Sequence, residues 1–193
     1  MTQRKDHNKT LNSGERQVSD NLNNIEKNHI LRYKKACEYI KNEHIVMDLG
    51  CGCGYGSYML SQIARFVISI DDSKEAIEYA KIHWKRNNIE YFCKNALHCR
   101  EVMSKSIRPD IIVAFEIIEH IKDTDKLFEL IGQLAKEKII FSVPSKKIPV
   151  KRSKWHWRHF DKEEISVYLD NIGFSVEYFE DINKTLIFIA KRK

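Results

Sequence analysis

The sequence lacks any run of apolar residues approaching the roughly 18 that cross a bilayer, and its first twelve residues are mainly polar. It contains five cysteines, an odd number, and no two of them have the C-x-x-C spacing of a redox or zinc site. Internal repeats are also absent. These absences argue against a membrane-spanning segment, a secretory leader and a disulfide framework. We therefore expect a cytoplasmic protein with reduced thiols and no insertion into a membrane.

The overall composition is that of an ordinary globular protein. Of the 193 residues, 42% are hydrophobic and 31% are charged, and a chain of this length has room for one domain of typical size. The formal net charge of +6 fits an anionic partner such as RNA, but lysine-rich surfaces are also common without one. Nucleic acid is therefore a less favoured partner than a small molecule. No feature of the sequence indicates an oligomeric state.

Strand and helix patterns alternate along the chain after a polar start. Residues 1–24 show almost no apolar periodicity, so we assign them to a flexible tail and residues 25–193 to the domain. The domain opens with an amphipathic helix at 25–40. Short apolar strands and further helices are expected at 45–49, 56–65, 66–70, 73–86, 89–93, 110–115, 123–136 and 138–143. This alternation predicts an α/β fold with a parallel sheet and helices on both faces.

The C-terminal part departs from this alternation. A helix at 162–171 is followed by Gly173, and strands are expected at 175–179 and 185–190. The segment 180–184 between those strands is too short for a parallel crossover, which needs about a dozen residues. The closing pair of strands is therefore predicted to be antiparallel.

A glycine-rich loop follows the first strand. Four of the seven glycines fall in this one window, at Gly50, Gly52, Gly54 and Gly56. Glycine allows positive φ angles there and lets a ligand approach the backbone closely. A dinucleotide fingerprint would need glycine at position 55, which is Tyr55, and no Lys-Ser/Thr pair of a P-loop follows. Asp48 precedes the glycines, and its negative charge suits a cationic or hydroxyl-bearing ligand rather than a pyrophosphate.

A second acidic group follows the second strand. Asp71 lies 71 − 50 = 21 residues after Gly50, close to the offset of about 20 residues at which a carboxylate binds ribose hydroxyls. Its neighbour Asp72 is either a further contact or a solvated residue at the start of a helix. The glycine loop and Asp71 together predict a nucleoside-binding crevice at the carboxyl ends of the strands.

These motifs resemble those of class I S-adenosylmethionine-dependent methyltransferases. The first motif of that family is similar to V-M-D-L-G-C-G-C-G-Y-G-S at 46–57, and the second is similar to S-I-D-D-S at 69–73. Where the family usually has an Asp-Ala pair touching adenine, this chain has K-N-A at 94–96. The fourth-strand motif resembles D-I-I-V-A-F-E-I-I-E-H-I at 110–121. The resemblance extends over 45–190 and is to small-molecule and glycan types such as the ubiquinone-biosynthesis O-methyltransferases.

The resemblance implies a Rossmann-like, seven-stranded and mostly parallel sheet with an antiparallel last strand, and S-adenosyl-L-methionine as the cofactor. It places the methionine part beside Asp48 and the glycines, the ribose at Asp71, and the adenine at Asn95. The complete set of expected cofactor contacts is Asp48, Gly50, Cys51, Gly52, Tyr55, Gly56, Asp71, Asp72, Asn95, Ala96 and Phe115. Asn95 stands where the family usually has Asp, but its side-chain carbonyl can still accept a hydrogen bond from an amino group.

Methyl transfer to a hydroxyl needs a proton acceptor beside the aligned reactants. The candidates that follow the fourth strand are Glu116, Glu119 and His120. His120 is the preferred general base because a histidine pKa is about 6.5 in solution, although it can instead pack under the cofactor and orient the loop. Acceptor contacts are expected from the helix 25–40 and from the segment W-H-W-R-H-F-D at 155–161. These residues are His29, Arg32, Tyr33, Trp155, His156 and His159.

Three functions follow from these patterns. The favoured one is O-methylation of a small-molecule or glycan acceptor without a metal. The E-x-x-E-H pattern at 116–120 also resembles the set with which small-RNA 2′-O-methyltransferases of the Hen type hold a divalent ion, here Glu116, Glu119, His120 and His156 or His159. The third alternative is a cofactor-binding regulator that has no transfer activity.

Overall fold

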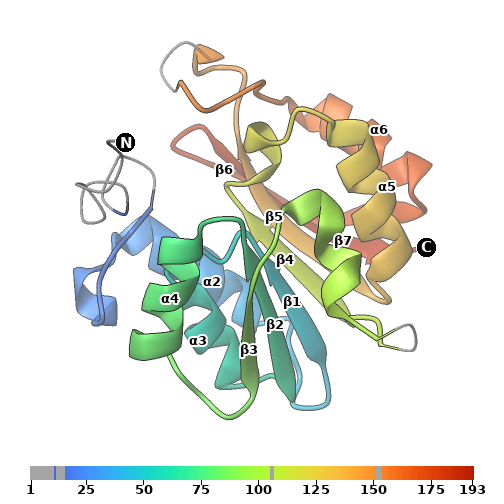
Figure 1. Ribbon diagram of the computed structural model, residues 1–193. Helices are drawn as coiled ribbons and strands as arrows, with labels where there is room; N and C mark the ends of the chain where they lie inside the picture. The colour runs from blue at the N-terminus through green and yellow to red at the C-terminus, as the bar shows by residue number, and fades with distance from the viewer. Residues whose placement is uncertain (1–10, 12–15, 105–106, 151–153) are drawn as a thin grey trace, which may run out of the picture.

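The computed structural model describes residues 11, 16–104, 107–150 and 154–193. Its centre is one sheet of seven strands in the order β3-β2-β1-β4-β5-β7-β6 (Figure 1). The strands are β1 Ile45–Leu49, β2 Phe66–Asp71, β3 Ile89–Cys93, β4 Ile111–Phe115, β5 Lys138–Pro144, β6 Phe174–Ile182 and β7 Thr185–Arg192. Only β7 runs against its neighbours, pairing antiparallel with both β5 and β6. The predicted Rossmann-like sheet with an antiparallel last strand is confirmed.

The C-terminal hairpin is tighter than the sequence suggested. Both β6 and β7 extend beyond the expected strands and leave only Asn183 and Lys184 as the turn. These two residues have φ angles of 52° and 70°, as in the primed turns whose twist matches that of the paired strands.

Helices cover both faces of the sheet (Figure 1). One face carries α2 Lys27–Cys37, α3 Tyr55–Ser61 and α4 Lys74–His83, and the other carries α5 Thr124–Leu134 and α6 Lys162–Asn171. The 3-10 helices η1 Leu22–Asn24, η2 Ala96–Val102 and η3 Ile118–His120 were not anticipated. The expected helices are present. The helix at 162–171 has the expected bounds, and the other four are shorter because terminal turns are poorly specified by apolar spacing. Within the described part of the chain, no helix has both the length and the apolar composition that a bilayer crossing requires.

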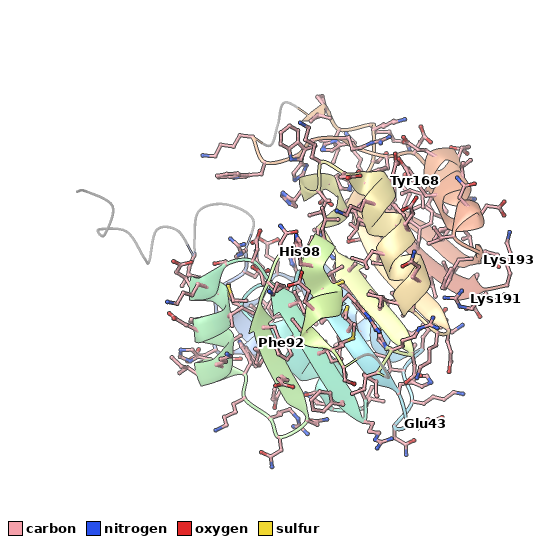
Figure 2. All side chains as sticks on the ribbon, turned by 45° about the vertical axis from the view of Figure 1, so that its right-hand side comes forward. Glu43, Phe92, His98, Tyr168, Lys191 and Lys193 are labelled. Atoms are coloured by element: carbon pink, nitrogen blue, oxygen red, sulfur yellow. The ribbon has the colours of Figure 1, made fainter. Side chains whose placement is uncertain are left out.

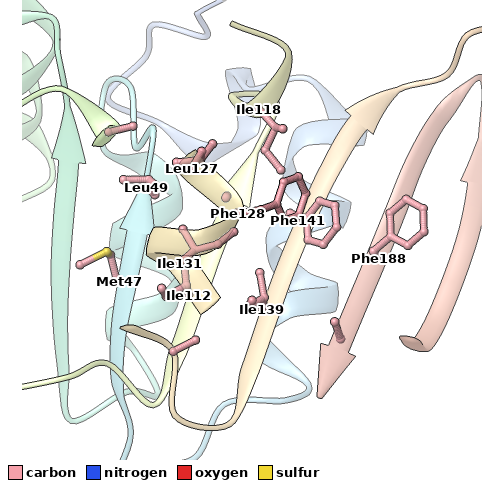
Figure 3. Packing of buried hydrophobic residues seen from close by; sticks show 14 of the residues in the cluster. Met47, Leu49, Ile112, Ile118, Leu127, Phe128, Ile131, Ile139, Phe141 and Phe188 are labelled. Atoms are coloured by element: carbon pink, nitrogen blue, oxygen red, sulfur yellow. The ribbon is translucent and has the colours of Figure 1, made fainter. Parts of the chain in front are cut away.

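The core is divided between the two faces because side chains alternate along each strand. Met47 and Leu49 of β1 are fully buried against the face covered by α5, where Phe128 and Ile131 pack (Figure 3). Val46 points to the opposite face, toward α2 and α3. Asp48 shares that second face by the same alternation. A carboxylate is therefore built into the interior, directly beneath the glycine loop.

Charged side chains coat the outside of the domain (Figure 2). Lys191 and Lys193, at the end of β7, and Glu43, before β1, lie at the surface. Lys193 pairs with Asp170, and Lys147 reaches Asp181 at 2.8 Å. Part of the positive charge is thus neutralised locally by neighbouring carboxylates.

The strand order reverses between β1 and β4, since the chain builds outward first to β3 and then to β5. Ligands of open α/β sheets bind at such a reversal, outside the carboxyl ends of the strands. A ligand-binding site is therefore expected at the carboxyl ends of β1, β2 and β4.

Candidate active site

A cleft of about 800 Å³ opens at this reversal. Its walls come from the loop after β1, the ends of β2 and β4, helix α2, and the segment before α6. The predicted site residues in its lining are His29, Arg32, Tyr33, Gly50, Cys51, Gly52, Tyr55, Asp71, Asp72, Asn95, Ala96, Phe115, Glu116, His120 and Trp155. The predicted residues outside the lining are Asp48, Gly56, Glu119, His156 and His159.

The glycine loop needs its glycines for different reasons. Gly50 and Gly52 have φ angles of 78° and 53°, which side-chain-bearing residues rarely adopt. A Cβ on Gly50 would lie 2.6 Å from Ile117 Cδ1, so this glycine is required by packing. A Cβ on Gly52 would meet no described atom within 4 Å. Gly52 therefore faces open space, where a ligand can approach its backbone.

Asp71 is held at the end of β2 as a preorganised acceptor. Its Oδ2 accepts a hydrogen bond from Gly52 N at 2.9 Å, and its Oδ1 accepts one from Ser73 N at 2.9 Å. The guanidinium of Arg16 lies 3.2 Å from the same Oδ1 and 3.7 Å from Asp72. Asp71 is buried, whereas Asp72 is largely exposed.

Arg16 belongs to the segment that we assigned to a tail, of which residues 1–10 and 12–15 lie outside the described part. Residues in 16–24 contact the domain at several points, and Trp84 Nε1, at the end of α4, donates to Ser19 O at 3.1 Å. Gln17 Oε1 accepts from Glu26 N at 3.3 Å. Arg16 and Gln17 both line the cleft. Residues 16–24 show no apolar periodicity, so these contacts could not be predicted from the sequence.

Asp48 lies behind the glycine loop instead of in the lining. Ser57 Oγ donates to its Oδ2 at 2.6 Å, and Tyr33 OH donates to its Oδ1 at 3.1 Å. Burial raises the pKa of Asp48 to about 7, against the opposing effect of these two hydrogen bonds. The residue therefore ties α2 and α3 to β1, and it acts on any ligand through them.

The raised pKa of Asp48 predicts a pH-dependent stability. An unfolded Asp loses its proton near pH 3.9, whereas the folded carboxyl keeps it up to about pH 7. Its contribution is therefore complete at low pH and is lost as the pH rises through that interval. In the wild-type protein, this group should lower the unfolding free energy by about 2–3 kcal/mol between pH 5 and pH 8, and we expect that loss to be absent in Asp48→Asn. Urea titrations of both proteins at the two pH values measure this difference, and parallel pH profiles would contradict it.

Helix α2 brings a half-buried histidine and a buried arginine to the cleft. His29 Nδ1 lies 2.9 Å from Tyr55 OH, and burial, together with Arg32, lowers the pKa of His29 to about 4. His29 is thus neutral near pH 7. Arg32 is 7% exposed, and its Nε has no hydrogen-bond partner among the described residues. A buried cation of this kind suits an anionic group of a ligand.

The end of β4 carries the candidate catalytic residues. Glu116 has a φ angle of 50°, uncommon for a residue with a side chain, and Ser142 Oγ donates to its Oε1 at 2.6 Å. Such strained backbone often occurs at functional sites. His120 borders the cleft from η3, while Glu119 is fully buried beneath it. The main chain thus turns Glu116 and His120, but not Glu119, toward the cleft.

The segment before α6 supplies two tryptophans and two histidines. Trp155 and Trp157 line the cleft and are 52% and 60% exposed. His156 lies behind them with its ring perpendicular to that of His120, at a centroid separation of 4.8 Å. Ligand atoms of Glu119, His120 and His156 all lie within 4.8 Å of one another. Trp157 and, after β3, Lys94 also line the cleft, although neither was among the site residues predicted from the sequence.

The strand order, the antiparallel last strand and a cleft beside a glycine loop define the Rossmann-like class of methyltransferases. The profile of the family described as "Methyltransferase domain" matches residues 40–164. The chain belongs to this family. The resemblance to class I S-adenosylmethionine-dependent methyltransferases is thereby confirmed.

Individual relatives agree with this assignment. The ubiquinone biosynthesis O-methyltransferase of Pelagibacter ubique is 34% identical over 92 residues, which cover 48% of this chain and 38% of that protein. An RNA methyltransferase of Clostridium tetani, described as uncharacterized, is 33% identical over 116 residues, which cover 56% of this chain and 25% of that protein. This chain thus spans less than half the length of these two curated relatives.

The fold of nearly the whole chain is shared with a solved structure. It is the magnesium protoporphyrin IX methyltransferase of Synechocystis PCC 6803 with bound SAH, with a TM-score of 0.74 and 16% identity. The match covers 97% of this chain and 94% of that chain. At this identity the likeness establishes the fold alone.

The residues of the cleft fit S-adenosylmethionine. A volume of about 800 Å³ is within the range of cofactor sites. The cofactor carries ribose hydroxyls, a carboxylate and cationic groups. Asp71 offers acceptors for hydroxyls, and Arg32 offers a buried positive charge with an unpaired Nε among the described residues. The open space at Gly52 completes a cradle that a side chain there would narrow.

Proposed function

We propose that this chain methylates an oxygen atom of a small-molecule or glycan acceptor, with S-adenosylmethionine as the methyl donor. The observation that carries the proposal is the arrangement of the cleft. A carboxylate and a glycine loop form one end, and a histidine, a glutamate and two tryptophans form the other. One end suits a nucleoside, and the other suits an acceptor with a removable proton.

At the cofactor end, Asp71 would hold the ribose, and the backbone of Gly50, Cys51 and Gly52 would border the amino-acid part. Asn95 and Ala96 would border the adenine. Asn95 Oδ1 already accepts a hydrogen bond from Leu97 N at 3.0 Å, and a carbonyl oxygen has a second lone pair for a ligand. Tyr55 and Phe115 complete this wall, and the exposed Asp72 lies at its edge without holding the cofactor. Asp48 and Gly56 act indirectly, through the position of Tyr33.

At the acceptor end, this chain aligns the hydroxyl and removes its proton. When bound, S-adenosylmethionine supplies a methyl group activated by a sulfonium. His120 would take the proton of the acceptor hydroxyl, and Glu116, fixed by Ser142, would orient the acceptor. Trp155 and Trp157 offer flat faces for a ring or sugar, with Lys154 4.8 Å from the Trp155 ring and Lys122 5.3 Å from that of Trp157. His29, Arg32 and Tyr33 close the cleft from α2.

Transfer of an isotope tests this function. The purified protein is incubated with methyl-labelled S-adenosylmethionine and a cell extract, and the labelled products are separated into small molecules, glycans and RNA. We expect label in a small-molecule or glycan fraction, either in a base-stable methyl ether or in a methyl ester that base hydrolyses. His120→Ala should reduce incorporation at least tenfold. Cofactor binding without label in any fraction would instead indicate a regulator.

A metal-assisted RNA 2′-O-methyltransferase is the second candidate. It is supported by the cluster of Glu119, His120 and His156 and by the likeness to the Clostridium tetani protein. Three side chains of this kind can bind a divalent ion that polarises a ribose hydroxyl. Glu116 and His159, which the sequence also suggested as ligands, lie outside this cluster.

Chelation separates the two candidates. For the favoured function, incorporation of label should be unchanged within a factor of about two after exhaustive treatment with EDTA and should not depend on added Mg²⁺ or Mn²⁺. Loss of incorporation, restored by one of these ions and found in the RNA fraction, would favour the second candidate.

Cytoplasmic location and the boundary between tail and domain at residue 25 remain predictions alongside these proposals.

The ion pair of Arg16 with Asp71 predicts competition with the cofactor. Ribose hydroxyls would have to displace a guanidinium that lies 3.2 Å from Asp71 Oδ1. A partly exposed ion pair is worth about 0.2–1 kcal/mol, so Arg16→Gln should tighten binding of S-adenosylhomocysteine about two- to fivefold. The gain should disappear at about 0.5 M salt, where charges are screened. Calorimetry at both salt concentrations measures it, and weaker binding by the variant would mean that Arg16 contacts the cofactor.

A further inference from the structure

We propose that the buried His159 is a positioning residue that sets which ring nitrogen of His156 carries the proton and, through the adjoining main chain, does the same for His120. The inference rests on the proposed function, in which His120 accepts the proton of the acceptor hydroxyl. His159 does not line the cleft, so the cleft lining alone does not indicate this role.

The segment that carries these histidines is firmly attached to the domain. Phe160 is fully buried, its N donates to Pro144 O at 3.1 Å, and Lys146 N donates to Phe160 O at 2.8 Å. Trp157 N donates to Glu119 O at 2.8 Å. The backbone on both sides of His159 is therefore fixed, and its ring can be aimed reproducibly.

The hydrogen-bond partner of His159 determines which of its ring nitrogens carries the hydrogen. Its Nδ1 lies 2.7 Å from Ile148 O. A carbonyl oxygen only accepts, so the hydrogen must reside on Nδ1. In the neutral ring the other nitrogen, Nε2, then has a lone pair and no hydrogen. His159 is 4% exposed, so turning Nδ1 away from Ile148 O would leave a buried ring donor without its partner.

The tautomer of His159 in turn determines the tautomer of His156. His156 Nδ1 lies 2.7 Å from His159 Nε2. Since His159 Nε2 is the acceptor, His156 Nδ1 must be the donor, and the Nε2 of a neutral His156 keeps its lone pair. Two hydrogen bonds in series thus select a single tautomer of His156. In water the Nε2–H form of histidine is the more populated one, so the selected Nδ1–H form is a consequence of the fold.

His120 is constrained by the same segment. Its Nδ1 lies 3.2 Å from Trp155 O, again a carbonyl, so this nitrogen is a donor and Nε2 is the basic atom. Trp155 directly precedes His156 in the chain. The bond between His156 and His159 therefore fixes the main chain that presents the Trp155 carbonyl. A base whose tautomer is set in advance needs no reorganisation when the acceptor binds.

The three histidines therefore have different roles. His120 presents Nε2 as the proton acceptor. The His156 ring lies beside the His120 ring, and ligand atoms of both lie within 4.8 Å of one of Glu119. His159 touches neither the cleft nor the reacting atoms and acts through its two hydrogen bonds. Its removal should therefore lower the transfer rate and leave cofactor affinity unchanged.

Nitrogen-15 NMR of the imidazoles tests the proposal on the whole chain. In the wild-type protein at pH 8, long-range proton–nitrogen correlations should show His156 and His120 as Nδ1–H tautomers. His159→Phe keeps a ring of similar size without donor or acceptor, and should shift His156 toward the Nε2–H form. His159→Gln retains one amide donor and one carbonyl acceptor and should restore the Nδ1–H form. His83→Phe, at an exposed histidine at the end of α4, serves as the control for assignment.

The functional measurements use the same variants. Incorporation of label from S-adenosylmethionine into extract should fall at least tenfold in His159→Phe and recover in His159→Gln, with S-adenosylhomocysteine affinity unchanged within about twofold. An Nε2–H form at His156 in the wild-type protein would overturn the proposal, whatever the variants do. An unchanged His156 tautomer in folded His159→Phe would also overturn it. If the tautomers are as expected but no variant or wild type transfers label, the proposed function fails while the hydrogen-bond chain stands.

Discussion

Replacing Asp71 with asparagine is expected to weaken the binding of S-adenosylhomocysteine about 10- to 100-fold, which corresponds to about 1.4–2.8 kcal/mol. Asp71 is buried at the end of β2 and lines the cleft, and its two carboxylate oxygens are held in place by Gly52 N and Ser73 N. Hydrogen bonds to a charged acceptor are worth about 1.5–3 kcal/mol, because the partner is otherwise left desolvated without compensation. Asparagine keeps one acceptor oxygen and replaces the other with a donor, which faces the ribose hydroxyls and Gly52 N unfavourably.

A matched control is available at the next position. Asp72 has a side chain that is 67% exposed, so Asp72→Asn should change the affinity by no more than about twofold. Calorimetry with both variants measures the difference, and thermal unfolding without ligand shows whether the glycine loop has been disturbed. Equal affinities for the two variants, with both folded normally, would refute the assignment of the ribose to Asp71.

The sheet was predictable because each of its strands left a local signature. The five strands from β1 to β5 are short apolar runs bounded by polar or turn residues, and β7 follows β6 too closely for a crossover. The three 3-10 helices left no comparable signature, because η1 and η3 have three residues each and η2 has seven, too few to show an apolar periodicity. η3 matters most among them, since it sets the directions of Glu119 and His120.

The site was predictable where one segment supplies both the motif and its geometry, as in the glycine loop followed by Asp71. It was not predictable where segments meet only in space. The contact of Arg16 with Asp71 joins positions 55 residues apart, and the chain from His156 to Ile148 depends on how an irregular segment folds back. Asp48 is a different case, because strand alternation alone places it on the side of Val46, facing α2 and α3. Its role behind the loop was available from the sequence.

Replacing Gly56 with alanine is expected to destabilise the protein by about 3 kcal/mol or more. A Cβ at this position of α3 would overlap the ring of Tyr33. That ring is buried, meets Phe115 edge-on at a centroid distance of 5.0 Å, and carries the hydroxyl that donates to Asp48. Overpacking a rigid interior usually costs about 1–3 kcal/mol, and displacement of Tyr33 would add the loss of a buried hydrogen bond. Urea unfolding without cofactor measures the change.

Two further variants distinguish this clash from a general cost of losing glycine. Gly52→Ala adds a Cβ that meets no described atom within 4 Å but has a φ angle of 53°, so it should cost only the backbone strain of about 1–2 kcal/mol. Tyr33→Ala removes the ring itself. In that background Gly56→Ala should cost little or even stabilise α3, because alanine is the better helix former by about 1 kcal/mol. Additive effects of the Tyr33 and Gly56 substitutions would contradict the clash, since residues that share one space are expected to couple strongly.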